Sequence, residues 1–385
     1  MIACAYVLSI APLLGGIIGL AGRSWRPAAQ FALAVAVSTF PPLFEWVLSF
    51  GPDQLCAILT AYGLYLVSLG MSRNCAGRFS VLAGASLLSF TGAVRPELIT
   101  TLPIVAMVFA FVWLAQNYRA SAMGPSILLT RGRMFCLILP LVFTVTGNIG
   151  YRWTCFDEAR MFGRLEVPCP GVEAWCRTWV NSESECLAQI VWPLGHSNPT
   201  LTVESIPSRA FASERERTFV ASILADASAA QLLTRELDDR FAELATERIK
   251  RNWWLHWFVP RAWRPIHLWV NLELNSQLLD ACANIPRWIR RPVLGWFVLQ
   301  KASILILVLL ATRRLLRIPF MNEITAVDLF AMQAVVFVVS RTLLIGVLLG
   351  SHEHRYATVA WPLCLVAAAY AIRPNTSDAP RVGLS

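Results

Sequence analysis

The chain has 385 residues, of which 56% are hydrophobic and only 15% are charged. This composition excludes a soluble globular domain, in which about 25% of the residues are charged. The formal net charge is +9. This net charge comes mostly from arginines that follow apolar segments, so it indicates membrane topology and argues against nucleic-acid binding. The composition therefore predicts a multi-pass membrane protein.

The apolar stretches are long enough to cross about 30 Å of hydrocarbon as helices. They predict an all-α, polytopic protein with about nine transmembrane helices and one large extracytoplasmic loop. The expected spans are 2–20, 28–49, 54–70, 79–94, 98–114, 134–150, 293–311, 326–349 and 356–372. We expect an N-terminal membrane bundle at 1–150, the polar loop at 151–292, and a C-terminal membrane bundle with a short cytoplasmic tail at 293–385.

Arginine sets the expected orientation, because cytoplasmic loops collect Lys and Arg. The short loops of one side hold only Arg95 and Arg355, and the other side holds Arg23, Arg26, Arg73, Arg78, Arg119, Arg131, Arg133, Arg313, Arg314, Arg317, Arg373 and Arg381. This places the 151–292 loop outside and the C-terminus inside. All basic residues except Lys250 and Lys301 are arginine, which is typical of a GC-rich bacterial gene. The expected location is a bacterial inner membrane.

The expected orientation puts Met1 outside, with no hydrophilic leader before the first apolar segment. Two interpretations compete. The 2–20 span is a signal peptide, although it lacks a basic start and a convincing small-residue cleavage site. Alternatively, a segment upstream of Met1 is missing.

Four cysteines lie close together in the outside loop, where an oxidising compartment favours disulfides in a segment poor in core. The disulfide candidates are Cys155, Cys169, Cys176 and Cys186. A zinc site is the alternative, but the spacing lacks the close cysteine pairs that structural zinc prefers. The sequence does not give the connectivity.

The rest of the outside loop contains two patterns. Residues 208–250 predict an amphipathic helix with a solvated charged face. The following stretch, from Trp253 to Trp269, alternates tryptophan with arginine and proline. Such a stretch favours the bilayer interface, so we expect it to lie along the outer leaflet. An aromatic platform for sugars is the alternative.

Two charged clusters fall at the expected outer ends of spans. The first holds Arg95 and Glu97, and the second holds His352, Glu353, His354, Arg355 and Tyr356. One interpretation is two short hairpins whose charges face water. The other is a phosphate and sugar site at the membrane surface, because arginine's planar fork suits phosphate oxygens and a nearby His or Glu can move a proton.

Two further charges lie inside expected spans, namely Lys301 and Arg341. A charged side chain in hydrocarbon costs about 3 kcal/mol even on insertion scales, so it usually faces a wet cavity or a partner. Snorkelling to the interface is the alternative, and it suits Lys301 better. Arg341 therefore joins Arg95 and Arg355 as a candidate ligand for phosphate.

Several short motifs resemble those of GT-C membrane glycosyltransferases of the protein-mannosyltransferase and aminoarabinose-transferase type. They include a Pro-Pro, an Arg-Pro-Glu with a proline beyond it, and an entry to a late span that is similar to "E-x-R-Y…P". In this chain they are Pro41-Pro42, Arg95-Pro96-Glu97 with Pro103, and Glu353-His354-Arg355-Tyr356 with Pro362. Gly51 to Leu55 and Ala245 to Trp254 are also similar to segments of that family.

The resemblance implies transfer of a sugar from a polyprenyl-phosphate donor to a glycan, lipid or protein acceptor on the outer face. The displacement inverts the sugar, with a carboxylate as base. Arg95, Arg341 and Arg355 would hold the lipid phosphate. The sugar or acceptor pocket would be lined by Glu97, His352, Glu353, His354 and Tyr356.

One departure from the family concerns the base. The family has an extra N-terminal helix and a first outside loop that carries the catalytic acid, and this chain begins after them. The gene model is then truncated, a partner subunit supplies the acid, or the protein is an inactive relative. The adjacent pair Asp157 and Glu158, just beyond the 134–150 span, is the candidate replacement.

The rival class is a non-catalytic multi-pass protein, either transporter-like or a subunit of a polysaccharide export system. Lys301 and Arg341 fit a transporter, but no repeat relates the two halves. The sequence lacks a P-loop, a Rossmann glycine pattern, a paired-histidine zinc motif and Gly-x-Ser-x-Gly, so it predicts no soluble-type nucleotide-using enzyme. A divalent cation stays open as a cofactor.

Overall fold

The computed structural model describes residues 52–72, 77–95, 98–118, 130–156, 169–179, 190, 194, 201–254, 258, 262, 265–266, 268–269, 286–317, 324–344, 357 and 359–372. Every regular element within these ranges is a helix, and no strand occurs in them. The chain forms two compact units. Unit 1 comprises Met1–Phe162, Trp269–Thr342 and His354–Ser385, and unit 2 comprises Gly163–Leu268 and Leu343–Glu353.

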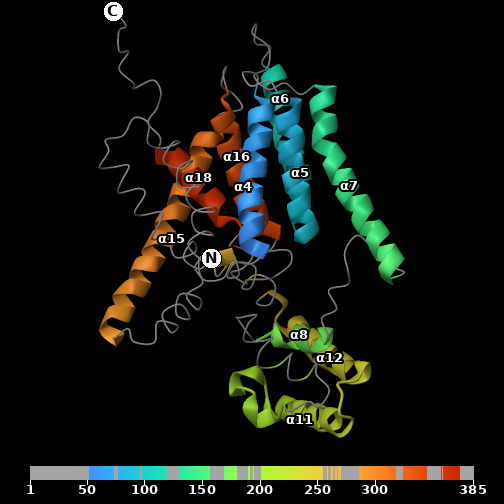
Figure 1. The fold of residues 1–385 in the computed structure, drawn as a ribbon. Helices are drawn as coiled ribbons and strands as arrows, with labels where there is room; N and C mark the ends of the chain where they lie inside the picture. The colour runs from blue at the N-terminus through green and yellow to red at the C-terminus, as the bar shows by residue number, and fades with distance from the viewer. Residues whose placement is uncertain are drawn as a thin grey trace, which may run out of the picture. The chain divides into compact units, whose positions relative to one another are not determined.

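Unit 1 is a bundle of apolar helices (Figure 1). Its helices are α4 (Pro52–Met71), α5 (Arg78–Val94), α6 (Thr101–Tyr118), α7 (Arg131–Phe156), α15 (Arg287–Leu315), α16 (Ala326–Arg341) and α18 (Trp361–Ile372). Four segments are long and apolar enough to cross a membrane, namely Thr101–Tyr118, Arg131–Gly150, Arg291–Leu315 and Ala326–Leu344. The prediction of an all-α, membrane-type protein is thus confirmed. Two of the expected spans, 2–20 and 28–49, lie outside the described residues.

Helices α4 and α5 pack closely because glycines face each other across them. A Cβ added at Gly84 would lie 2.6 Å from the Gly63 carbonyl oxygen and 2.8 Å from the Val67 nitrogen. Small residues allow such close approach between helices in a membrane, where apolar side chains gain little by leaving lipid. The two helices run in opposite directions, so the start of α4 and the end of α5 share one end of the bundle.

Replacing Gly84 with Ala should push α4 and α5 apart and lower the stability of unit 1 by about 1–3 kcal/mol, as overpacking of a tight contact does. The measurement is thermal unfolding of the full-length protein in detergent. Gly147→Ala is the matched control, because a Cβ there meets nothing within 4 Å. Equal unfolding temperatures for the two variants would contradict the close packing.

Helices α15, α16 and α18 form the other half of the bundle. A capping box starts α16, since the Thr325 hydroxyl accepts from the Asp328 N–H and the Asp328 carboxylate accepts from the Thr325 N–H. The same carboxylate accepts a hydrogen bond of 2.8 Å from the Tyr370 hydroxyl near the end of α18. The Arg314 guanidinium, in the last turn of α15, lies over the Tyr370 ring and donates to the Tyr370 carbonyl. These contacts join the basic end of α15 to the ends of both neighbours.

The end of α4 also lies among basic residues. Arg133, at the start of α7, donates to the Met71 carbonyl oxygen over 3.4 Å. Arg78 starts α5, and a Cβ added at Gly132 would meet its guanidinium at 2.9 Å. The contacts place the arginines that flank α4, α5 and α7 together, as the predicted alternation of loops requires.

Unit 2 is a small helical body with its own apolar core. Its elements are α8 (Pro170–Cys176), the 3₁₀ turns η3 (Val203–Ser205) and η4 (Ser208–Ala210), α11 (Glu214–Ala229) and α12 (Arg235–Arg251). Trp175 lies fully buried in the centre, with its ring 5.3 Å from Phe241 and 5.4 Å from Trp179. Val220 and Ile223 of α11 bury their side chains in the same core.

The single helix predicted over 208–250 is wrong, because the chain breaks it into α11 and α12. Gln231 adopts a left-handed φ of 54°. The Leu232 N–H bonds the Ala227 carbonyl and the Gln231 N–H bonds the Ser228 carbonyl, which is a Schellman ending. Thr234 then caps α12 by accepting from the Leu237 N–H. A threonine before an acidic turn was the available signal for this break.

Asp238 fixes α8 against α12. Its two carboxylate oxygens accept from the Gly171 and Val172 N–H groups, at 2.8 and 2.9 Å, so they satisfy donors that the first turn of α8 leaves open. The approach is so close that a Cβ added at Gly171 would lie 1.9 Å from the Asp238 carbonyl oxygen. The acidic residues of the predicted solvated face, Glu236, Asp239, Glu243 and Glu247, are exposed, and Asp238, which is not on that face, is buried.

Candidate functional site

An ion pair between Arg95 and Asp53 marks one end of the unit 1 bundle. Arg95 ends α5 in extended backbone, as expected for a residue that precedes proline, and its N–H bonds the Thr91 carbonyl over 2.8 Å. Asp53 lies in the first turn of α4. The antiparallel packing of α4 and α5 therefore brings these two residues together.

The Arg95 guanidinium has a donor that the described residues leave without an acceptor. It contacts Asp53 through Nη2, and its side chain is only 20% exposed. Its Nε is buried and has no hydrogen-bond partner among the described residues. A buried donor left unsatisfied costs about 1–3 kcal/mol, and more when it belongs to a charged group. An anion that reached Nε would remove this cost.

Arg341 lies at the same level of the bundle. Helix α4 ends and α16 begins at basic loops, so the two neighbouring helices run in opposite directions (Figure 1). The rings of Tyr65 and Phe330 meet at 5.6 Å between them. Asp53 precedes Tyr65 by about 18 Å of helix and Arg341 follows Phe330 by about 16 Å, at 1.5 Å per residue. Arg341 is buried, with 3% exposure, near the level of Asp53.

Aromatic residues surround the end of α16 as well. The Trp269 indole donates to the Thr342 hydroxyl over 2.9 Å, and its ring lies 5.2 Å from that of Trp361. Trp269 is only 6% exposed, unlike Trp253 and Trp254, which are more than half exposed. The Trp269 ring thus packs into the bundle, and the interfacial position of the tryptophan stretch stays a prediction.

Other predicted site residues lie outside the described residues, so their roles stay predictions. They are Glu97, Asp157, Glu158, His352, Glu353, His354, Arg355 and Tyr356. Lys301 is described and lies buried on α15, with 4% exposure. The structure thus places Arg95 and Arg341 at one end of the bundle.

Asp53 is the acidic residue that sequence reasoning missed as a site candidate. It was noticed only as part of the Gly51 to Leu55 motif. The predicted topology contained the signal. The span at 54–70 was expected to run inward and the next one, at 79–94, outward, so the start of the first and the end of the second must lie at the same end of the bundle. Asp53 and Arg95 satisfy that condition.

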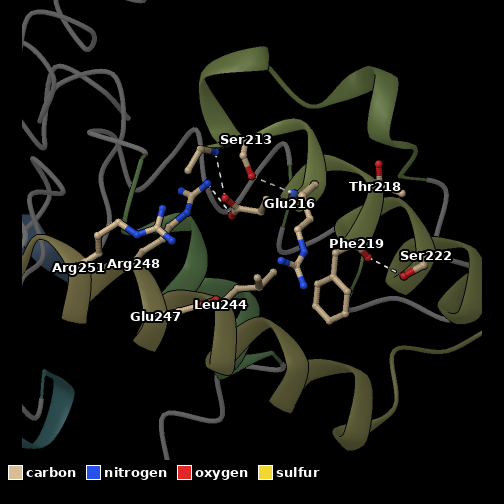
Figure 2. A pocket seen from close by; sticks show the side chains of 11 residues that line it. Ser213, Glu216, Thr218, Phe219, Ser222, Leu244, Glu247, Arg248 and Arg251 are labelled. Atoms are coloured by element: carbon tan, nitrogen blue, oxygen red, sulfur yellow. Dashed lines mark hydrogen bonds and ion pairs between the residues drawn. The ribbon is translucent and has the colours of Figure 1, made fainter.

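Unit 2 contains a second polar site, a pocket of about 670 Å³ between the start of α11 and the end of α12 (Figure 2). Glu216 and Arg248 form its most buried pair, with 2.6 Å between Oε1 and Nη2. Glu216 also accepts from the Trp175 indole and from the Ala212 N–H. Arg248 donates to the Thr178 hydroxyl and to the Ala210 carbonyl.

The contacts of Glu216 keep it ionised. Burial by itself raises the pKa of this carboxyl group, but the hydrogen bonds from Arg248, Trp175 and Ala212, with the positive charge of Arg248, outweigh it. The pKa of Glu216 is therefore lowered. The pair is held from several directions, so it forms a rigid wall of the pocket.

Of the four disulfide candidates, the side chains of Cys169 and Cys176 lie within the described residues. Cys169 is a free thiol at the start of α8, so the structure contradicts its place in that prediction. Burial, followed by the nearby charge of Asp238, raises the pKa of Cys169 to about 11, which makes the thiol unreactive. Cys176, buried on α8, is not in a disulfide either, so its place in the prediction is contradicted as well. The side chains of Cys155 and Cys186 lie outside the described part, so a disulfide between these two stays a prediction.

Within the described ranges, no group of three or more His, Cys, Asp or Glu side chains could hold a metal ion. Comparisons with protein-family models, with curated proteins and with solved structures each found no match. The resemblance to GT-C glycosyltransferases therefore rests on the sequence motifs alone.

Proposed function

We propose that the protein is a membrane glycosyltransferase that takes a sugar from a polyprenyl-phosphate donor at the Arg95 end of unit 1. The observation that carries the proposal is the buried Arg95 Nε, which has no hydrogen-bond partner among the described residues and lies beside an ion pair with Asp53. A lipid phosphate offers several acceptor oxygens, and the arginine fork suits them. The lipid tail would remain in the bilayer beside the apolar helices.

The second support is the position of Arg341 on the neighbouring helix. Two guanidinium groups near one level can share the charge of a phosphate, which develops further as the phosphate leaves. Keeping such charges in a membrane bundle costs free energy, so an anionic ligand gives them a physical reason to be there. Arg355 remains a third predicted ligand.

The transfer itself needs a base, and among the described residues Asp53 is the carboxylate that contacts Arg95. The acceptor hydroxyl oxygen attacks the anomeric carbon of the sugar, and the bond from that carbon to the phosphate oxygen breaks. The lipid phosphate leaves with the bonding electrons, and the hydroxyl proton passes to Asp53. The displacement inverts the anomeric centre. Asp53 would thus take the role that the sequence suggested for Asp157 or Glu158.

The test compares Arg95→Ala with Arg78→Ala, the same change at the other end of α5. We expect the full-length protein in nanodiscs to bind polyprenyl phosphate more tightly than polyprenol. Arg95→Ala should weaken phosphate binding at least about tenfold, since a charged hydrogen bond contributes about 1.5–3 kcal/mol. Arg78→Ala should leave binding unchanged.

Asp53→Asn separates binding from chemistry. This variant should still bind polyprenyl phosphate but should no longer release sugar from a polyprenyl-phosphate hexose or pentose. Equal binding of polyprenyl phosphate and polyprenol, or equal losses in Arg95→Ala and Arg78→Ala, would overturn the phosphate site. Tight phosphate binding with no sugar release by the unmodified protein would favour a non-catalytic lipid-binding protein.

A further inference from the structure

The unit 2 pocket has a wall that hydrogen bonds hold in place, and two arginine side chains that form no ion pair among the described residues. The Glu216–Arg248 pair forms the wall, since its contacts to Trp175 and to the backbone hold it in place. Arg215 on α11 and Arg251 on α12 also line the pocket, and both side chains are exposed. A preformed wall means that a ligand has little to reorganise on binding.

Arg215 and Arg251 differ from Arg217 and Arg240 of the same helices. Arg217 pairs with Glu214, and Arg240 pairs with Asp226. Among the residues that the structure describes, Arg215 and Arg251 form no ion pair. Each therefore offers an unused planar fork, which is suited to a carboxylate or a phosphate group.

The remaining lining combines apolar side chains with hydrogen-bond acceptors. Phe219 is 39% exposed, and Figure 2 shows its ring at the pocket together with Leu244. The hydroxyls of Thr218 and Ser222 donate to the backbone carbonyls of Glu214 and Phe219, so their oxygens remain available as acceptors. The Glu247 carboxylate, also in the lining, is a further acceptor.

These three features together specify one kind of ligand. A pyranose ring has an apolar face that suits an aromatic ring, and its hydroxyls donate to acceptor oxygens. An acidic group on the sugar would engage the two free arginines. A neutral sugar would leave them unused, and a bare anion would leave Phe219 and the hydroxyl oxygens unused.

We propose that this pocket binds a saccharide that carries an acidic group, either a uronate or a sugar phosphate. Arg215 and Arg251 hold the acidic group, and the sugar ring lies against Phe219. The proposal goes beyond the transfer reaction proposed for unit 1 and does not rest on it. A protein that failed every test of polyprenyl-phosphate binding could still have this site.

Isothermal titration calorimetry on the full-length protein in detergent tests the proposal. The probes are digalacturonate, glucose 1-phosphate, the neutral disaccharide cellobiose and inorganic phosphate. At least one of the two acidic saccharides should bind at least tenfold more tightly than both cellobiose and phosphate. The tighter of the two identifies the acidic group.

Variants assign the contacts. Arg215→Gln and Arg251→Gln should each weaken binding of the acidic saccharide at least about fivefold. Arg217→Gln is the matched control, because Arg217 lies on the same helix but does not line the pocket, and it should change binding less than twofold. Phe219→Ala should weaken saccharide binding without changing the weak binding of phosphate. All four side chains are exposed, and circular dichroism checks that each variant is folded.

Three outcomes would overturn the proposal. Acidic saccharides that bind no better than cellobiose would remove the role of the arginines. Inorganic phosphate that binds as tightly as glucose 1-phosphate, with digalacturonate no tighter, would remove the sugar contact. An equal loss in Arg217→Gln and Arg215→Gln would show that only the overall charge of the surface attracts the ligand.

Discussion

Arg248→Met should destabilise unit 2 by about 3–5 kcal/mol, the usual effect of leaving one member of a buried ion pair without its partner. Glu216 would keep its place in the core, where Trp175 and the Ala212 N–H hold it, but it would lose the guanidinium that offsets its desolvation. A loss of this size is a large fraction of the stability of a small domain. Hydrogen exchange of the α11 and α12 amides in the detergent-solubilised full-length protein measures it.

Two further variants show whether the lost pair is the cause. Arg240→Met removes an exposed pair with Asp226 and should cost at most about 1 kcal/mol. Adding Glu216→Gln to Arg248→Met should recover part of the loss, because the amide oxygen still accepts hydrogen bonds and carries no charge. Similar exchange rates in Arg248→Met and Arg240→Met would contradict the importance of the buried pair.

Gly171→Ala should have an effect of similar size, about 2–5 kcal/mol. The new methyl group would meet the Asp238 carbonyl oxygen at 1.9 Å, and this neighbour is backbone, so α8 has to move away from α12. The shift adds an overpacking cost of about 1–3 kcal/mol to the loss of helix caps, which is about 1–2 kcal/mol. The measurement is thermal unfolding of the full-length protein in detergent, with hydrogen exchange of the α8 amides reporting on unit 2.

Asp238→Ala separates the two contributions to that loss. It removes both hydrogen bonds to the start of α8 but leaves the helices free to keep their distance. We expect about 1–2 kcal/mol for this change, less than for Gly171→Ala. If Gly171→Ala cost no more than Asp238→Ala, the close contact between the helices would not contribute to stability.

Hydropathy predicted the positions of the apolar helices well. The apolar segment predicted at 79–94 corresponds to the helix α5, Arg78–Val94, and its crossing of a membrane stays a prediction. The span predicted at 134–150 ends at the same residue as the candidate membrane segment Arg131–Gly150, and α7 itself continues to Phe156 as a helix with polar residues. Composition could not give the break at Gln231 either, since this residue adopts a conformation usually reserved for glycine.

The candidate site was less accessible, because sequence reasoning considered each charge at its own loop. Arg95 and Arg341 were selected for their position, but the partner of Arg95 was not, since Asp53 is a single acidic residue at a helix start. Arg215 and Arg251 lie far apart in the sequence, and only the packing of α11 on α12 brings them to one pocket. Whether two such residues lie close together depends on how the helices pack, which the sequence pattern does not show.

Helix α18 has a consequence for how the protein is made. The described helix has 12 residues. It therefore covers about 18 Å, which is well short of the hydrocarbon thickness. Every residue from Trp361 to Tyr370 is buried, so its surroundings are protein side chains. The ribosome produces α18 after α15 and α16, the two helices that it contacts most. We therefore expect integration of this segment to include docking onto those helices, with the contacts of Tyr370 to Asp328 and Arg314 contributing to its placement.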